Sequence, residues 1–189
     1  SSPKPQNTTS YALNSSTEKP PERLWSILQQ SKGNSHAILF RHAIAPGGGD
    51  PPQFQLNDCS TQRNLSEEGR KQAAKIGQEL KRQKIPIAQV LSSQWCRCLE
   101  TARLMELGEV QAYPPLNSFF SDRSRTDQQT AQLRSFLLKN YQKTGVMILV
   151  THQVNITALT DIFPQSGEGV VVRVDRDKPT IEVLGRLSP

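Results

Sequence analysis

The chain has 189 residues, of which 35% are hydrophobic, and this size and apolar content suffice for one domain with a buried core. No run of about 18 apolar residues occurs, which excludes a predicted membrane-spanning helix. The net charge of +6 suits an anionic partner, but the basic residues are scattered and form no stripe with aromatic residues, so we expect no nucleic-acid binding.

The first twenty residues differ in composition from the rest of the chain. Residues 1–20 are rich in Ser, Thr, Asn and Pro and predict a disordered leader, whereas residues 21–189 predict a single domain. A polar leader of this kind often follows a removed export signal. We therefore expect a periplasmic or secreted protein, with a cytoplasmic protein as the alternative.

Apolar spacing predicts an alternation of helices and strands in the first half of the domain. An amphipathic helix is expected over 21–30, and a strand buried on both faces over 37–41. A loop then runs over about 43–64, and Ser66 is expected to cap a helix that reaches about residue 84. A strand over 88–93 leads into a helix that begins near residue 96.

The second half continues the same alternation. A short strand is expected over 110–114, and Thr126 with Gln129 matches the capping box of a helix. The strongest strand signal covers 146–152, and the short helix after it is stopped by Pro164. The closing strands are expected over 169–174 and 180–187. Together these elements predict an α/β fold: a three-layer sandwich with a mostly parallel central sheet and helices on both faces.

Polar side chains follow three of the predicted strands. Arg41 and His42 end the first strand, the segment 92–97 with Arg97 follows the second, and His152 ends the strand over 146–152. The carboxyl ends of parallel strands meet at one edge of a sheet, where ligands of α/β proteins bind. We therefore expect these two Arg and two His side chains to gather at that edge.

The motifs that carry these residues resemble a known family. "LFRHA" resembles the R-H-G signature of the histidine phosphatase (phosphoglycerate mutase-like) superfamily, and "NLSEEGRKQA" resembles its L-T-x-x-G-x-x-Q-A helix start. "LSSQWCRCLETA" is similar to its S-S-x-x-x-R-x-x-Q-T-A segment, and "ILVTHQ" to its strand ending in V-x-H-G. The four motifs lie in family order over residues 37 to about 160. With "DCSTQRNL" and "THQVNITAL", the chain most resembles small exported bacterial members.

The resemblance implies a phosphomonoester hydrolase that works through a phosphohistidine intermediate on His42. Arg41, Arg97 and His152 would bind the phosphoryl group, which carries about two negative charges and suits the planar, always charged guanidinium group. A nucleophilic His42 must be neutral, with its other ring nitrogen donating to a backbone carbonyl of the loop. Two alternatives are a phosphoglycerate mutase-like phosphoryl transferase and a non-catalytic phosphate-binding module that keeps the fold.

Further residues are candidates for the same site. Asp122 is the candidate general acid, because Phe119 and Phe120 beside it in the sequence would desolvate it; the alternative is a turn residue or a partner of a neighbouring Arg. The family usually has Gly after the second His, and Gln153 in that position can reshape the pocket. The candidate substrate-binding residues are Arg63, Asn64, Gln153 and Asn155.

Composition bears on cofactors, partners and disulfides as well. We expect no metal and no cofactor, because the Arg and His side chains supply the positive charge that a metal would provide. The partner is expected to be a small phosphorylated substrate or phosphate, and the protein a monomer. In an oxidising compartment, Cys59 is able to pair with Cys96 or Cys98, which have no zinc-site spacing.

Overall fold

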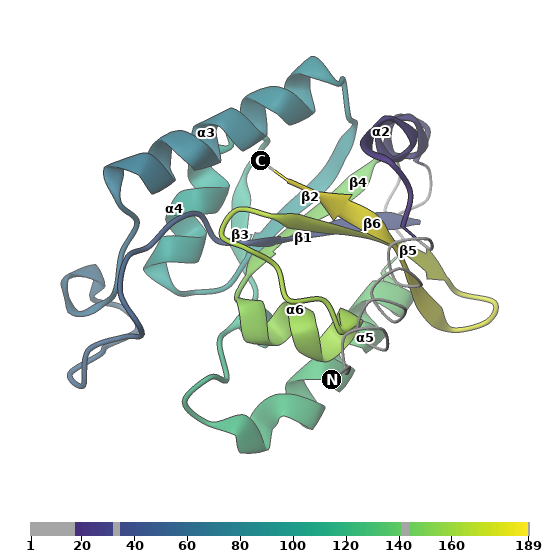
Figure 1. Ribbon diagram of the computed structural model, residues 1–189. Coiled ribbons are helices and arrows are strands. Elements are labelled where there is room, and N and C mark those ends of the chain that lie inside the picture. The colour runs from purple at the N-terminus through teal and green to yellow at the C-terminus, as the bar shows by residue number, and fades with distance from the viewer. Residues whose placement is uncertain (1–17, 32–34, 141–143, 189) are drawn as a thin grey trace, which may run out of the picture.

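A six-stranded sheet forms the centre of the molecule (Figure 1). The computed structural model describes residues 18–31, 35–140 and 144–188, so most of the leader expected over 1–20 lies outside the described residues. The strand order is β3-β2-β4-β1-β5-β6. The strands are β1 (His36–Arg41), β2 (Ile87–Ser92), β3 (Val110–Ala112), β4 (Val146–Thr151), β5 (Gly169–Asp175) and β6 (Thr180–Leu187).

The sheet is mostly parallel, as the apolar strands predict. The four strands β1 to β4 run parallel to one another, and β5 and β6 close one side as an antiparallel pair. All six residues of β4 are buried, because this strand pairs with β2 and β1 and both of its faces are covered by helices. None of the described helices is long and apolar enough to cross a membrane.

Helices cover both faces of the sheet, which confirms the predicted three-layer α/β sandwich. The helices are α2 (Pro21–Gln29), α3 (Glu67–Arg82), α4 (Cys96–Leu104), α5 (Thr126–Lys139) and α6 (Gln153–Thr160). In Figure 1, α2, α3 and α4 lie on one side of the sheet and α5 and α6 on the other. Side chains of β1 alternate between the two cores: Ile38 and Phe40 pack towards α3, and Leu39 packs towards α5 and α6.

The start of α5 differs from the prediction. Thr126 is already helical, with φ −54° and ψ −55°, and its hydroxyl donates to the Arg123 carbonyl, so it is not the cap of a capping box. A short 3₁₀ turn over 123–125 leads directly into the helix, and the capping side chain is Asp122, which accepts from the Ser124 N–H. The predicted partner Gln129 instead donates to the carbonyls of Pro115 and Asn117. The other predicted elements are confirmed to within a few residues at their ends.

The loop after β1 is held tightly against α3 and α4. The Ala43 N–H donates to the Thr101 hydroxyl of α4, and the Ile44 N–H donates to Gln72 of α3. A Cβ atom on Gly69 would lie 2.1 Å from the Ile44 carbonyl oxygen, so only glycine allows this approach. These contacts explain why the two motifs around Gly69 and Thr101 accompany the "RHA" motif in the sequence.

Candidate active site

Three strand ends bring His42, Arg97 and His152 together. His42 follows β1, Arg97 lies in the first turn of α4 after β2, and His152 precedes α6 after β4, which lies between the other two strands. The ring centroids of His42 and His152 are 5.6 Å apart, and Arg97 Nε lies 3.2 Å from His42 Nε2. All three side chains are buried, yet they line a cavity of about 860 Å³. The sheet edge therefore holds the predicted cluster.

The tautomer of His42 follows from its two partners. Its Nδ1 lies 2.8 Å from the Ala43 carbonyl oxygen, which only accepts, so Nδ1 carries the proton. Arg97 Nε is always a donor, and its N–H points at His42 Nε2, which therefore presents a lone pair. This is the neutral form that a nucleophilic histidine needs, and the loop carbonyl is the partner that the sequence predicts.

The surroundings keep both histidines uncharged. Burial lowers the pKa of His42 first, and the charge of Arg97 lowers it further, to about 3. Burial and the neighbouring His42 and Arg97 also hold the pKa of His152 well below its usual value while no anion is bound. Both rings are therefore neutral at pH 7.

Ser93, Trp95 and Cys98 contact the His152 ring. Its Nε2 is 2.9 Å from the Ser93 hydroxyl and 3.5 Å from the thiol of Cys98. Burial raises the pKa of that thiol to about 12, so Cys98 is a neutral thiol that packs against the ring. The indole of Trp95 meets the His152 ring at a centroid distance of 5.3 Å. The orientation of the imidazole is therefore fixed before any ligand arrives.

Two further guanidinium groups line the cavity. Arg41 donates to the Pro164 carbonyl at 3.1 Å, and Arg63 donates to the carbonyls of Ala45 and Gly47. Arg63 thus holds the glycine-rich loop and adds a third positive charge at the cavity.

Asp50 is a component of the site that sequence reasoning missed. Its carboxylate accepts from both terminal nitrogens of Arg97, at 2.8 and 3.3 Å, from the Trp95 indole N–H and from the Arg63 backbone N–H. Partial burial raises the pKa of Asp50, but the hydrogen bonds from Arg97 and the other donors outweigh this and lower it. Asp50 is therefore ionised and orients Arg97. The signal was its place in "APGGGD", directly after three glycines in the loop predicted over about 43–64.

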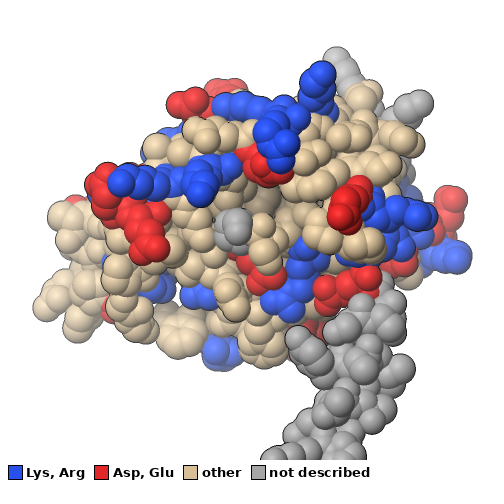
Figure 2. Space-filling model, turned by 45° about the horizontal axis from the view of Figure 1, so that its top comes forward, with Lys and Arg blue, Asp and Glu red and all other residues tan. Residues whose placement is uncertain are grey.

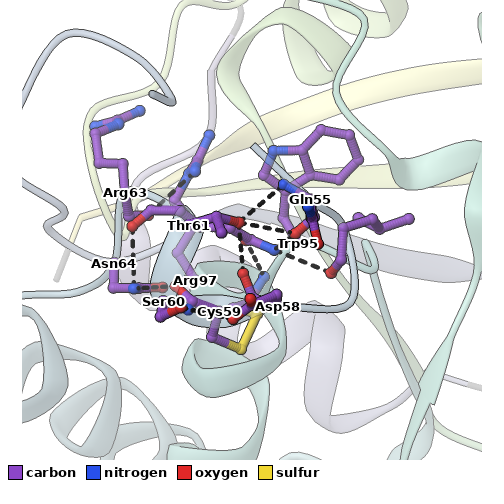
Figure 3. Close-up of a disulfide and its surroundings, with 12 residues drawn as sticks. Gln55, Asp58, Cys59, Ser60, Thr61, Arg63, Asn64, Trp95 and Arg97 are labelled. Atoms are coloured by element: carbon purple, nitrogen blue, oxygen red, sulfur yellow. Dashed lines mark hydrogen bonds between the residues drawn. A yellow bond between two sulfur atoms is a disulfide. The ribbon is translucent and has the colours of Figure 1, made fainter. Parts of the chain in front are cut away.

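A disulfide joins the loop at the cavity mouth to the helix that carries Arg97 (Figure 3). It links Cys59 to Cys96, the neighbour of Arg97, whereas Cys98 is free and buried. The Gln62 side chain accepts from the Cys96 N–H at 2.9 Å, and Arg97 donates to the Arg63 carbonyl at 3.2 Å. The loop over 59–64 and the start of α4 thus form one rigid unit.

The structure does not bring every predicted residue to the cavity. Gln153 lines it, with its amide donating to Thr157. Asn64 and Asn155 lie outside the lining, and their amides donate to backbone carbonyls, Asn64 to Cys59 and Asn155 to Asn117. They organise loops around the site rather than face a ligand.

The placement of Asp122 favours a turn residue over a general acid. Its carboxylate is exposed, lies outside the cavity lining and accepts from the backbone and hydroxyl of Ser124. The predicted desolvation does not occur, because Phe119 is buried in the fold while Phe120 is 59% exposed. The general-acid role of Asp122 therefore gains no support from this structure.

The charges at the cavity suit a dianion. Three guanidinium groups, on Arg41, Arg63 and Arg97, face one carboxylate, on Asp50, which leaves a net charge of +2 with both histidines neutral. A phosphoryl group carries about two negative charges. Elsewhere the charges are mixed: on the face in Figure 2, Lys and Arg alternate with Asp and Glu. Among the described residues, no group of three or more His, Cys, Asp or Glu could hold a metal ion.

Comparisons with known proteins agree with this geometry. The family model of the histidine phosphatase superfamily (branch 1) matches residues 38–118, which include His42, Asp50 and Arg97. Comparison with the curated proteins found no significant match.

Solved structures with the same fold cover most of the chain. The protein histidine phosphatase SixA complexed with tungstate is 17% identical with a TM-score of 0.60, and the match covers 82% of this chain and 97% of that one. A mycobacterial glucosyl-3-phosphoglycerate phosphatase is 14% identical with a TM-score of 0.61, covering 82% and 100%. A phosphoserine phosphatase from Entamoeba histolytica is 13% identical with a TM-score of 0.57, covering 82% and 97%.

The ion pair between Asp50 and Arg97 yields a prediction for stability. We expect Asp50→Asn to lower the free energy of unfolding by about 3 kcal/mol, because it leaves the buried Arg97 charge without its partner beside two other guanidinium groups. Denaturant unfolding measures this loss. The matched control is Asp58→Asn in the same loop, which is exposed and makes no ion pair with Arg97. An equal loss in both variants would contradict the role of Asp50.

Proposed function

We propose that this chain belongs to the histidine phosphatase superfamily and is a phosphomonoester hydrolase acting through a phosphohistidine intermediate, as the match to the superfamily model over residues 38–118 and the shared fold support. The observation that carries the proposal is the neutral His42 ring, which lines a cavity together with three guanidinium groups and whose unprotonated Nε2 accepts a hydrogen bond from Arg97. The similar solved structures include several phosphatases, in agreement with hydrolysis.

The first step transfers the phosphoryl group to the protein. As the phosphoryl group binds, Arg97 Nε passes its hydrogen bond from His42 Nε2 to a non-bridging oxygen, and Arg41 and Arg63 hold the other oxygens. The freed lone pair of His42 Nε2 then attacks phosphorus in line with the leaving group. An N–P bond forms while the bond between phosphorus and the leaving oxygen breaks, and that oxygen keeps the electron pair. The approaching anion favours protonation of His152, which then adds a charged donor to the cluster.

The second step hydrolyses the phosphohistidine and regenerates His42. A water molecule attacks phosphorus, the N–P bond breaks, and its electron pair returns to His42 Nε2 while inorganic phosphate forms. The proton of the water goes to solvent or to the phosphate product. Covalent catalysis divides one difficult reaction into two easier displacements. The fixed cations stabilise the charge of both transition states. In this scheme Arg and His supply the positive charge, so we propose that hydrolysis needs no metal.

The disulfide supports a proposal on location. Disulfides persist in oxidising compartments such as the bacterial periplasm and the extracellular space, and are rare in the cytosol. The link between Cys59 and Cys96 therefore favours a periplasmic or secreted protein.

Removal of the nucleophile tests the proposed function. We expect His42→Ala to lower kcat for an aryl phosphate at least about 10³-fold, while phosphate binding persists because the guanidinium groups remain. Steady-state kinetics and calorimetric titration with phosphate measure the two effects, in buffer containing a chelator.

Vanadate, a phosphate mimic, is expected to inhibit the unchanged protein by occupying the same cavity. Full turnover by His42→Ala, or full activity at saturating vanadate, would refute the mechanism.

Thiol labelling tests the disulfide and the proposed compartment. Protein isolated from its natural host without reductant and then unfolded is expected to react with maleimide at one cysteine, Cys98, whereas reduced protein reacts at three. Mass spectrometry counts the adducts. Labelling of all three cysteines without reductant would show that the bond is absent in the host and would contradict an oxidising location.

A further inference from the structure

The cavity extends well beyond the charged residues at its floor. Its volume of about 860 Å³ falls in the range of pockets that enclose drug-sized ligands, far more than a phosphoryl group needs. Away from the floor it is lined by Pro51, Pro52, Phe54, Trp95 and Phe120. This outer part is where the group that carries the phosphate must lie.

One wall of the outer cavity is a fixed pair of aromatic rings. Phe54 and Trp95 stack with centroids 5.0 Å apart and an angle of 26° between their planes. The Trp95 indole donates to Asp50, touches His152 and directly precedes the disulfide-bonded Cys96, so its plane is held from three sides. A rigid aromatic surface next to the phosphoryl position favours a flat, apolar leaving group.

Phe120 contributes a second aromatic surface at the rim. It lines the cavity although its side chain is 59% exposed, and among the described residues only Phe163 is another large apolar side chain left this exposed. The structure shows one ring contact for it, with the Arg123 guanidinium 5.3 Å from the ring centroid. The ring is therefore available to a ligand that enters the cavity.

None of the described side chains that line the outer cavity is placed to protonate a leaving group. Among the described residues that line the cavity, Asp50 has the sole carboxyl group, and four donors from Arg97, Trp95 and Arg63 keep both of its oxygens as acceptors. The serine and glutamine side chains of the lining hold no acidic proton at neutral pH. His152 lies beside His42, with the ring centroids 5.6 Å apart, where it is placed to contact the phosphoryl group in the proposed mechanism.

These observations restrict the leaving group. An alcohol has a pKa near that of water, far above that of a phenol, and its alkoxide departs slowly unless it is protonated. A phenol such as the tyrosine side chain has a pKa of about 10 and departs far more readily as an anion.

We infer that this site is built for aryl phosphates, in which the phosphoryl group is carried by an oxygen on an aromatic ring that packs against Trp95, Phe54 and Phe120. The inference rests on the proposed hydrolase activity and names its substrate class. Both a small phenolic phosphate and a phosphotyrosine side chain present this chemistry.

Four substrates distinguish the effect of the leaving group on the rate from the effect of the aromatic contact. Phenyl phosphate is aromatic with a phenolic oxygen, benzyl phosphate is aromatic with an alkyl oxygen, acetyl phosphate has a good leaving group without a ring, and glycerol phosphate has neither feature. We expect kcat/KM for phenyl phosphate to exceed that for benzyl phosphate at least about 100-fold, the contribution of a missing general acid. Asp122→Asn is expected to leave this ratio unchanged. The values of kcat/KM for a phosphotyrosine peptide and for phenyl phosphate then show whether the site prefers a phosphotyrosine side chain or a small phenolic phosphate.

A ring deletion tests the aromatic contact. Phe120→Ala is expected to lower kcat/KM for phenyl phosphate about threefold to tenfold, the effect of one lost ring contact, and to leave acetyl phosphate unchanged. Phe163→Ala is the matched control, because that exposed ring lies outside the cavity lining, and it is expected to change neither substrate.

The outcomes distinguish this inference from the proposed function. Equal rates with phenyl and benzyl phosphate, a ratio that changes in Asp122→Asn, or an equal effect of Phe120→Ala on phenyl and acetyl phosphate would overturn the substrate class and leave a hydrolase. Absence of turnover on all four substrates would overturn the hydrolase itself and the inference with it.

Discussion

The hydrogen bond between Arg97 Nε and His42 Nε2 is the interaction on which the rest of the site depends. The Ala43 carbonyl on the other side of the ring only accepts, and the guanidinium only donates, so the imidazole has one possible tautomer. The same guanidinium charge, together with burial, opposes protonation of the ring. A single side chain thus sets both the direction of the lone pair and the charge state of the proposed nucleophile.

Much of the surrounding structure serves to hold these two side chains. The Asp50 carboxylate accepts hydrogen bonds from both terminal nitrogens of Arg97, and the disulfide at Cys96 links the first turn of α4 to the loop over 59–64. Thr101, one turn further along α4, binds the backbone next to His42. The pocket is therefore rigid before a ligand binds, and catalysis by fixed charges requires this kind of preorganisation.

The sequence predicts the scaffold and the floor of the cavity because both follow from local patterns. Continuous apolar strands and helical spacing place the layers, and parallel strand ends bring His42, Arg97 and His152 together. Contacts between distant loops carry no such signal. The bond from Asp50 to Arg97 spans 47 positions, and the choice of Cys96 over Cys98 depends on which side of α4 the loop packs. Asp122 shows the converse case, since the phenylalanines beside it in the sequence do not bury its side chain in the fold.

The central claim is that His42 is held neutral with its proton on Nδ1. Histidine ¹⁵N chemical shifts measure this directly, and His42→Gln assigns the signals among the three histidines of the chain. Because the pKa of His42 is lowered to about 3, the account predicts a protonated Nδ1 and an unprotonated Nε2 that stay unchanged between pH 8 and pH 5. An imidazolium signal from His42 at pH 6, or a proton on Nε2, would contradict it.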